Sequence, residues 1–318
     1  MKRTHRFDMY LTAVASIARQ GDMRLDANET AMFARQLEDI DTELYRVEYP
    51  QLKGTSIVPT RTAINEGAEE YTFRSIDKAG RSAVIANYGS DVPRVDVQGK
   101  EESAKLFGHA ASYGFSIQDL RRSRMSGLPL ENERALAARE AIDLTNDTVC
   151  AFGESSIGVT GFWNNTGVSL VTPTTGTWLT ATAEQIADDL FKMERAVIVD
   201  SNGVEMADTV VMPPSLFALA STKRLANTEV TAMEFFLKKS LGVKNVEFWY
   251  HGETAGAASV PRIAMGRRDP KKLEFLLPLP FYQMAPEQKG LGFVINCDSR
   301  VGGVIFRYPK SWRYMDGC

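Results

Sequence analysis

The clearest candidates for polar chemistry are three arginines, Arg121, Arg122 and Arg124, which fill three of four successive positions. A guanidinium is planar and carries several N–H donors, so it suits carboxylates and phosphates. One interpretation is a solvated helix face on which these arginines pair with Asp119 or Glu131 of the same chain. Contact with nucleic acid is another, and it ranks last because the interspersed acidic residues repel phosphate.

No other pattern in the sequence predicts catalysis or ligand binding. Three isolated histidines lack the short spacing of a metal site: His5, His109 and His251. Phosphate-binding loops, dinucleotide fingerprints and nucleophile elbows are also absent from the sequence. The small-residue segment 251–259 could in principle cradle an anion, but a mobile loop is favoured. We therefore expect no catalytic residue, no cofactor and no metal, although a carboxylate site among the 40 acidic residues remains an alternative.

Composition describes an ordinary globular protein. The 37 basic residues are balanced by 40 acidic ones, and this net charge of −3 argues against a protein that coats nucleic acid by bulk attraction. No apolar run approaches the roughly 20 residues that cross a bilayer, and no signal peptide is recognisable, so synthesis in the cytoplasm is expected. The three cysteines have no metal-type spacing and are expected to be reduced, structural thiols: Cys150, Cys297 and Cys318.

The first third of the chain predicts two extended features. Residues 1–60 hold two short amphipathic patterns that are too thinly apolar for a domain, so we expect an arm that lies along another surface. Residues 69–76 alternate as a strand, 77–80 supply a turn and 81–88 return, which predicts a projecting β-hairpin with a charged tip. A two-stranded ribbon is marginal alone in water, so it should gain stability from another surface, for example a neighbouring subunit.

The rest of the chain predicts an α+β protein. Ser116 and Asp119 signal a short helix that Gly127 ends, and a long spine helix follows over 129–152. A second lobe of helices and strands begins after a link at 158–176, with a capping box at Thr182 and Gln185. From residue 273 the pattern is β, and we expect those strands to pack on the spine helix.

Several short segments then point to one family. They are 67–74 (GAEEYTFR), 86–88 (ANY), 91–97 (DVPRVDV), 113–119 (YGFSIQD), 127–130 (GLPL), 202–205 (NGVE) and 302–309 (GGVIFRYP). Together with the order of arm, hairpin, spine helix, inserted lobe and returning strands, they resemble a tailed-phage major capsid protein of the Hong Kong 97-type fold.

The resemblance implies a domain organisation and a function. It implies an N-terminal arm (1–65), an extended loop (66–100), a peripheral domain (101–176 and 271–318) and an axial domain (177–270). The implied function is self-assembly, through pentamers and hexamers, into an icosahedral head around double-stranded DNA in the virion. Portal, scaffolding and decoration proteins are the further partners that it implies. No removable scaffolding segment is recognisable in the sequence, and no motif transfers the Lys–Asn bond that welds some relatives.

In such a shell, copies contact each other in slightly different settings, which favours charged contacts. The candidate subunit-interface residues are Arg74, Asp77, Lys78, Arg81, Arg121, Arg122, Arg124, Glu131 and Arg134. Two alternatives stay open at this point. One is an encapsulin-like bacterial nanocompartment shell, and the other is a soluble α/β enzyme with an unrecognised carboxylate site.

Overall fold

The computed structural model describes residues 51–80, 82, 94–126, 130–174 and 176–318. The chain divides into two units, Met1–Tyr49 and Pro50–Cys318, and the described residues all belong to the second. Most of the expected arm therefore lies outside the described residues. Among the described helices, none has the length and apolar character needed to cross a bilayer.

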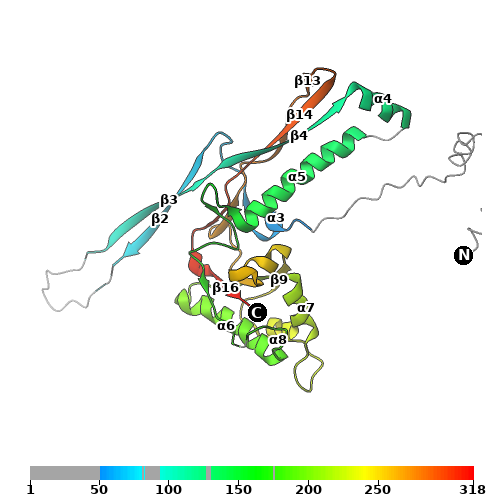
Figure 1. Cartoon of the computed structure of the whole chain (residues 1–318). Coiled ribbons are helices and arrows are strands. Elements are labelled where there is room, and N and C mark those ends of the chain that lie inside the picture. The colour runs from blue at the N-terminus through cyan, green and yellow to red at the C-terminus, as the bar shows by residue number, and fades with distance from the viewer. Residues whose placement is uncertain (1–50, 81, 83–93, 127–129, 175) are drawn as a thin grey trace, which may run out of the picture. The chain divides into compact units, whose positions relative to one another are not determined.

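One layer of the second unit is a five-stranded sheet accompanied by three helices (Figure 1). In spatial order its strands are β7 (Ser169–Leu170), β16 (Trp312–Asp316), β10 (Arg262–Gly266), β8 (Thr209–Met212) and β9 (Asn245–Phe248). The helices are α6 (Ala183–Asp200), α7 (Pro214–Thr222) and α8 (Ala232–Lys239). Helix α6 packs on α8, β10 and β16 through buried Leu190, Met193 and Val197. Its predicted capping box is confirmed, because Thr182 and Gln185 each accept a bond from the other's backbone N–H.

A small three-stranded sheet lies beside an aromatic core. Its order is β1 (Thr60–Arg61), β11 (Leu273–Leu276) and β15 (Val304–Phe306). The core joins residues from widely separated parts of the chain, including Ile57 of the short helix α3 (Gly54–Ile57), Phe162 and Trp312. Around Trp249, two 3₁₀ turns, η1 (Tyr250–Thr254) and η2 (Ala257–Ser259), follow β9, and a third, η3 (Pro309–Ser311), precedes β16. The prediction of a mobile loop over 251–259 is thus wrong in part, because Gly252 is buried against Trp163.

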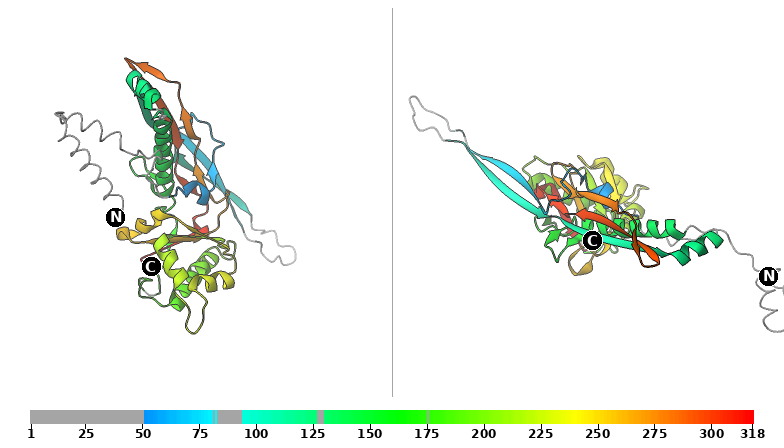
Figure 2. Two further views of the ribbon diagram at one scale, coloured as in Figure 1. Left: turned by 90° about the vertical axis from the view of Figure 1, so that its right-hand side faces the viewer. Right: turned by 90° about the horizontal axis from the view of Figure 1, so that it is seen from above.

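The long spine helix α5 (Leu130–Phe152) covers one face of a four-stranded antiparallel sheet. The strands are β12 (Leu279–Gln283), β14 (Gly292–Val301), β13 (Glu287–Lys289) and β4 (Phe107–Ser116), and β14 pairs with β4 over its full length. Ala138 and Ile142 of α5 meet Ile295 and Cys297 of β14 in a compact apolar cluster. Figures 1 and 2 both show α5 lying along β4 and β14. The expectation that the C-terminal strands pack on this helix holds for β14, whereas β11 and β15 belong to the three-stranded sheet.

The spine helix ends where its sequence predicted. Gly153 adopts φ +70°, and a Cβ at that position would lie 2.1 Å from the carbonyl oxygen of Val159. Any other residue would therefore be strained and would collide with the hairpin formed by β5 (Gly153–Glu154) and β6 (Val159–Thr160).

The projecting hairpin exists, but its register differs from the prediction. Strand β2 (Glu70–Ala79) pairs over ten residues with β3 (Asp96–Lys105), not with 81–88. Residues 77–79, expected in the turn, are paired with 96–98. The error arose because β3 reads DVQGKEESAK, which is polar and carries no apolar alternation. At the base of the hairpin, Tyr71 and Phe73 pack against Leu106.

Candidate functional site

The arginine segment lies on α4 (Ile117–Ser126), a short helix that follows β4. Its predicted cap is confirmed, because the backbone N–H groups of Ser116 and Asp119 each donate to the other's side chain. Arg121 and Arg122 are exposed, and Arg122 lies 3.9 Å from Asp119 with a side chain that is 80% exposed. An ion pair so open to water contributes little stability. The side chains of Arg124 and Glu131 lie outside the described residues.

Arg134 has a different role from the arginines of α4. Its Nη1 donates to the backbone oxygen of Gly114 (2.6 Å) and to Oδ2 of Asp119 (3.3 Å), so it ties α5 to the corner between β4 and α4. The backbone N–H of Ser116 and then Arg134 hold the pKa of the Asp119 carboxyl below its usual value. Within one chain, Arg134 therefore fixes the orientation of α4.

The charged residues predicted on the hairpin are only partly described. Arg74 donates to Glu101 on the opposite strand at 2.6 Å, and both side chains are mostly exposed. Asp77 and Lys78 belong to β2, with side chains outside the described residues, and Arg81 lies outside them altogether. The pairing partner Glu101 was not predicted, because the expected return strand was 81–88 and the observed one is β3.

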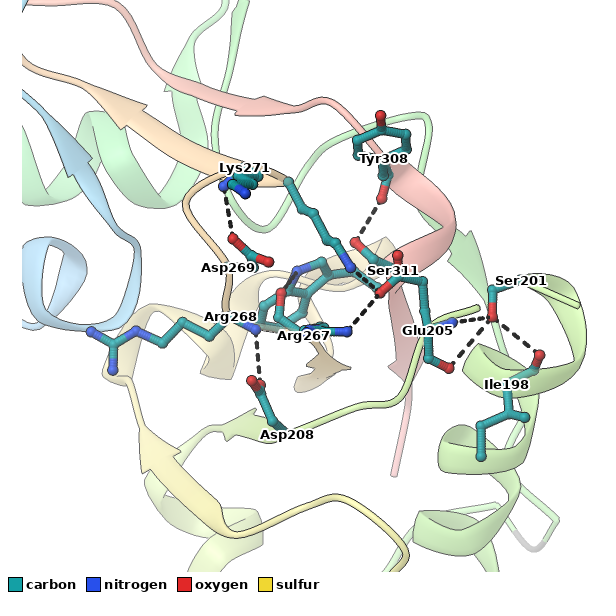
Figure 3. Close-up of polar contacts among 12 residues, drawn as sticks. Ile198, Ser201, Glu205, Asp208, Arg267, Arg268, Asp269, Lys271, Tyr308 and Ser311 are labelled. Carbon is teal, nitrogen blue, oxygen red and sulfur yellow. Dashed lines mark hydrogen bonds and ion pairs between the residues drawn. The ribbon is translucent and has the colours of Figure 1, made fainter. Parts of the chain in front are cut away.

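A further charged cluster joins the loop between α6 and β8 to the segment that leads from β10 to β11 (Figure 3). Buried Glu205 accepts from Lys272 and lies 3.7 Å from Arg267. Asp208 accepts from the backbone N–H of Arg268 at 2.8 Å. Because this segment connects two sheets, the cluster fixes the crossing point between them. These residues are too widely separated in sequence to reveal such a cluster by local spacing.

A buried carboxylate at the junction of several elements is Asp147 of α5, which is 4% exposed. Its Oδ1 accepts from the backbone N–H of Gly54 (2.6 Å), and its Oδ2 lies near Trp249 Nε1 (3.3 Å) and His251 Nε2 (3.1 Å). One side chain thus joins α3, α5 and the start of η1. The nearby Cys150 thiol is fully buried, and burial followed by the charge of Asp147 raises its pKa well above the usual value. A protonated, inaccessible thiol is a poor nucleophile, so this group supports structure and not catalysis.

The described part of the chain contains no group of three or more His, Cys, Asp or Glu side chains that could hold a metal ion. All three cysteines are buried and unpaired, as expected.

Comparison with known proteins identifies the family of this chain. The model of a family described as "Major capsid protein" matches residues 80–318. The chain belongs to this family. No curated protein sequence matches it.

Solved structures share its fold at low sequence identity. The capsid protein in "The capsid of Myoviridae Phage XM1" superposes with a TM-score of 0.79 at 15% identity, covering 90% of this chain and 98% of that one. A chain from Mycobacterium phage Bobi gives 0.64 at 13% identity, covering 92% and 99%. A virus-like particle from Pyrococcus furiosus gives 0.52 at 12% identity, covering 82% and 91%. The predicted Hong Kong 97-type α+β fold is confirmed, and the chain is a major capsid protein.

Proposed function

We propose that this major capsid protein assembles through pentamers and hexamers into a closed icosahedral head around the double-stranded DNA of a tailed phage. The observation that carries the proposal is the family match over 80–318 on a fold that this chain shares with phage capsids. The near-neutral charge fits a wall that encloses DNA without binding a particular sequence. Portal, scaffolding and decoration proteins are further proposed partners. The chain would be made in the cytoplasm of a bacterial host and reside in the virion.

The proposed domain roles follow the layers of the fold. Residues 1–65 would form the arm, 66–100 the extended loop, 101–176 and 271–318 the peripheral domain, and 177–270 the axial domain. The sheet pairing adds one refinement, since β16 and β7 extend the five-stranded sheet that contains β8, β9 and β10. The C-terminal strand would therefore belong to the axial layer.

The candidate interface residues differ in whether they already have a partner in their own chain. Arg121 and Arg122 are exposed on α4 and suit ion pairs with a neighbouring copy, as do Arg124, Asp77, Lys78, Arg81 and Glu131 by their positions. Arg74 and Arg134 already have partners in their own chain, so they would contribute mainly by holding the hairpin and α4 in place.

Electron microscopy and light scattering of the purified protein test the proposal. Closed particles of uniform size, able to protect DNA when produced with the other head proteins, are expected. Discrete species below a few hundred kilodaltons under every condition would contradict it. Replacing Arg121, Arg122 and Arg124 by Glu should weaken assembly in a salt-dependent manner, whereas Arg139→Glu on α5 serves as a control charge reversal. Unchanged assembly with a lowered subunit melting temperature would show that the three arginines serve the subunit alone.

A second candidate is an encapsulin-like shell around a protein cargo, favoured by the similarity to the particle from Pyrococcus furiosus. Particles that exclude DNA and retain a co-expressed protein would support it. Neighbouring terminase, portal and tail genes would instead support the phage head.

A further inference from the structure

The loop between α6 and β8 turns its apolar residues to water and its charged residue inward. Val204 and Met206 are 73% and 50% exposed, whereas Glu205 between them is 7% exposed. This is the reverse of the ordinary pattern, in which a glutamate is almost never buried unless it is paired. Because Glu205 points into the molecule, both of its neighbours lie on the outer side of the loop.

Several contacts hold Glu205 in this position (Figure 3). Its carboxylate accepts from Lys272 and lies 3.7 Å from Arg267. Its backbone N–H donates to the hydroxyl oxygen of Ser201 at 3.0 Å, and that hydroxyl donates to its backbone oxygen at 3.4 Å. Burying a carboxylate costs hydration that paired cations must offset. Here the buried group keeps two apolar neighbours in water.

A third exposed apolar side chain, Leu241, lies beside this loop. It is 74% exposed and belongs to the turn between α8 and β9. A Cβ on Gly242 would lie only 2.5 Å from the backbone oxygen of Ala207 and 3.5 Å from Cβ of Met206. Glycine therefore permits a close approach of the two backbones, which brings Leu241 next to Met206.

The turn that carries Leu241 is also held by a buried carboxylate. Glu194 of α6 is 4% exposed. Its Oε1 accepts from the hydroxyl of Ser240 (2.7 Å) and from the backbone N–H groups of Leu241 (2.9 Å) and Gly242 (3.1 Å). Two buried glutamates thus fix the two segments that present apolar side chains to water, so the arrangement is rigid before any partner arrives.

These three exposed side chains form what we call the apolar patch: Val204, Met206 and Leu241. Its surroundings are basic, because exposed lysines occur on both sides of Leu241 at positions 238, 239 and 244, and no acidic residue occurs between 235 and 246. Contiguous exposed apolar residues with a polar rim mark interaction sites. A positive rim favours a partner whose own rim is negative.

We propose that the apolar patch binds an acidic amphipathic segment of a second protein, with the apolar side chains of that segment on the patch and its carboxylates on the lysines. A symmetric pairing of two copies of this chain would bring the two sets of lysines together, and like charges repel. Nucleic acid would satisfy the lysines but leave the three apolar side chains in water. The patch is small, so one contact is weak. On the proposed shell, repetition of the patch would strengthen the binding of a partner that carries several such segments.

Fluorescence anisotropy with the full chain before assembly tests this binding. The probe is a labelled helical peptide of about 15 residues, in which leucines recur at three- and four-residue spacing and glutamates flank them. One matched peptide carries lysine in place of each glutamate, and another carries serine in place of each leucine. We expect the glutamate peptide to bind about tenfold or more tightly than either matched peptide, and its affinity to fall as salt is added.

Two variants of the chain separate the contributions of the patch and its rim. Met206→Gln with Leu241→Gln removes apolar surface, and Lys239→Glu with Lys244→Glu reverses the charge of the rim. The control is Leu179→Gln, because Leu179 is 72% exposed on the same lobe but precedes α6. Each test variant should bind the glutamate peptide about tenfold more weakly, and the control should change its affinity less than about twofold. All these side chains are exposed, so the melting temperature of the subunit should not change.

Equal binding of the three peptides would overturn the inference, as would wild-type affinity in the Met206→Gln, Leu241→Gln variant. Binding of a DNA duplex that survives this variant but is lost on reversing the lysines would assign the rim to nucleic acid instead. A higher protein concentration needed for assembly of the purified Met206→Gln, Leu241→Gln chain, without any peptide binding, would assign the patch to another copy. Failure of the wild-type chain to form shells would refute the proposed function and leave peptide binding by the subunit intact.

Discussion

Replacing Asp147 by Ala should destabilise the subunit more than any other single carboxylate change along α5. The carboxylate accepts from Gly54, Trp249 and His251, and two of these bonds are fully buried. A buried donor left without an acceptor costs about 1–3 kcal/mol, so the free energy of unfolding should fall by roughly 3–5 kcal/mol. Asp147→Asn keeps one oxygen but turns an amide toward a donor, and should lose about 1–3 kcal/mol.

Urea unfolding of the unassembled subunit, followed by tryptophan fluorescence, measures this loss. Asp143→Ala is the matched control one turn earlier on α5, where the carboxylate pairs with Arg139 at 3.7 Å on the surface. The control should change stability by less than about 0.5 kcal/mol. A loss below about 1 kcal/mol for Asp147→Ala would refute the view that this side chain joins three elements.

Three further predictions concern single groups. Lys223 donates to the carbonyl oxygens of Trp178, Leu179 and Ala181. Lys223→Met should therefore lower the free energy of unfolding, measured in thermal melts, by about 1–2 kcal/mol. The same change at exposed Lys244 is the control and should leave the free energy of unfolding unchanged. Burial lowers the pKa of His109, so the unfolded chain takes up a proton first as the pH falls, and the free energy of unfolding should decrease below pH 6.5. His109→Leu should lose less unfolding free energy than the wild type between pH 7 and pH 5. Equal losses in the two proteins would contradict this account. The three buried cysteines should resist a thiol-reactive dye in the native subunit and react in urea; rapid native labelling would show that a thiol is accessible.

Local chemistry made parts of this fold predictable. The caps at Ser116 and Thr182 and the stop at Gly153 each depend on residues within one helical turn. Their donors, acceptors and permitted φ angles are visible in a short stretch of sequence, which explains why the helix boundaries were predicted well.

Features that depend on distant partners were not predictable in the same way. The return strand β3 is polar along its length, and its register is fixed by pairing with β2 across an intervening segment. The sequence places Asp147 among the charged residues of α5, and its local spacing gives no sign that this carboxylate is buried. Its partner Gly54 is 93 residues away in the chain.

The single-residue junction at Leu106 makes the hairpin a lever on the sheet. Its backbone N–H bonds to the oxygen of Glu69, and its side chain is buried, so little slack separates β3 from β4. Over a lever of about 34 Å, a rotation of about 10° at the junction moves the far end by about 6 Å. Small adjustments of sheet twist would thus be magnified into a much larger displacement of the far end of the hairpin.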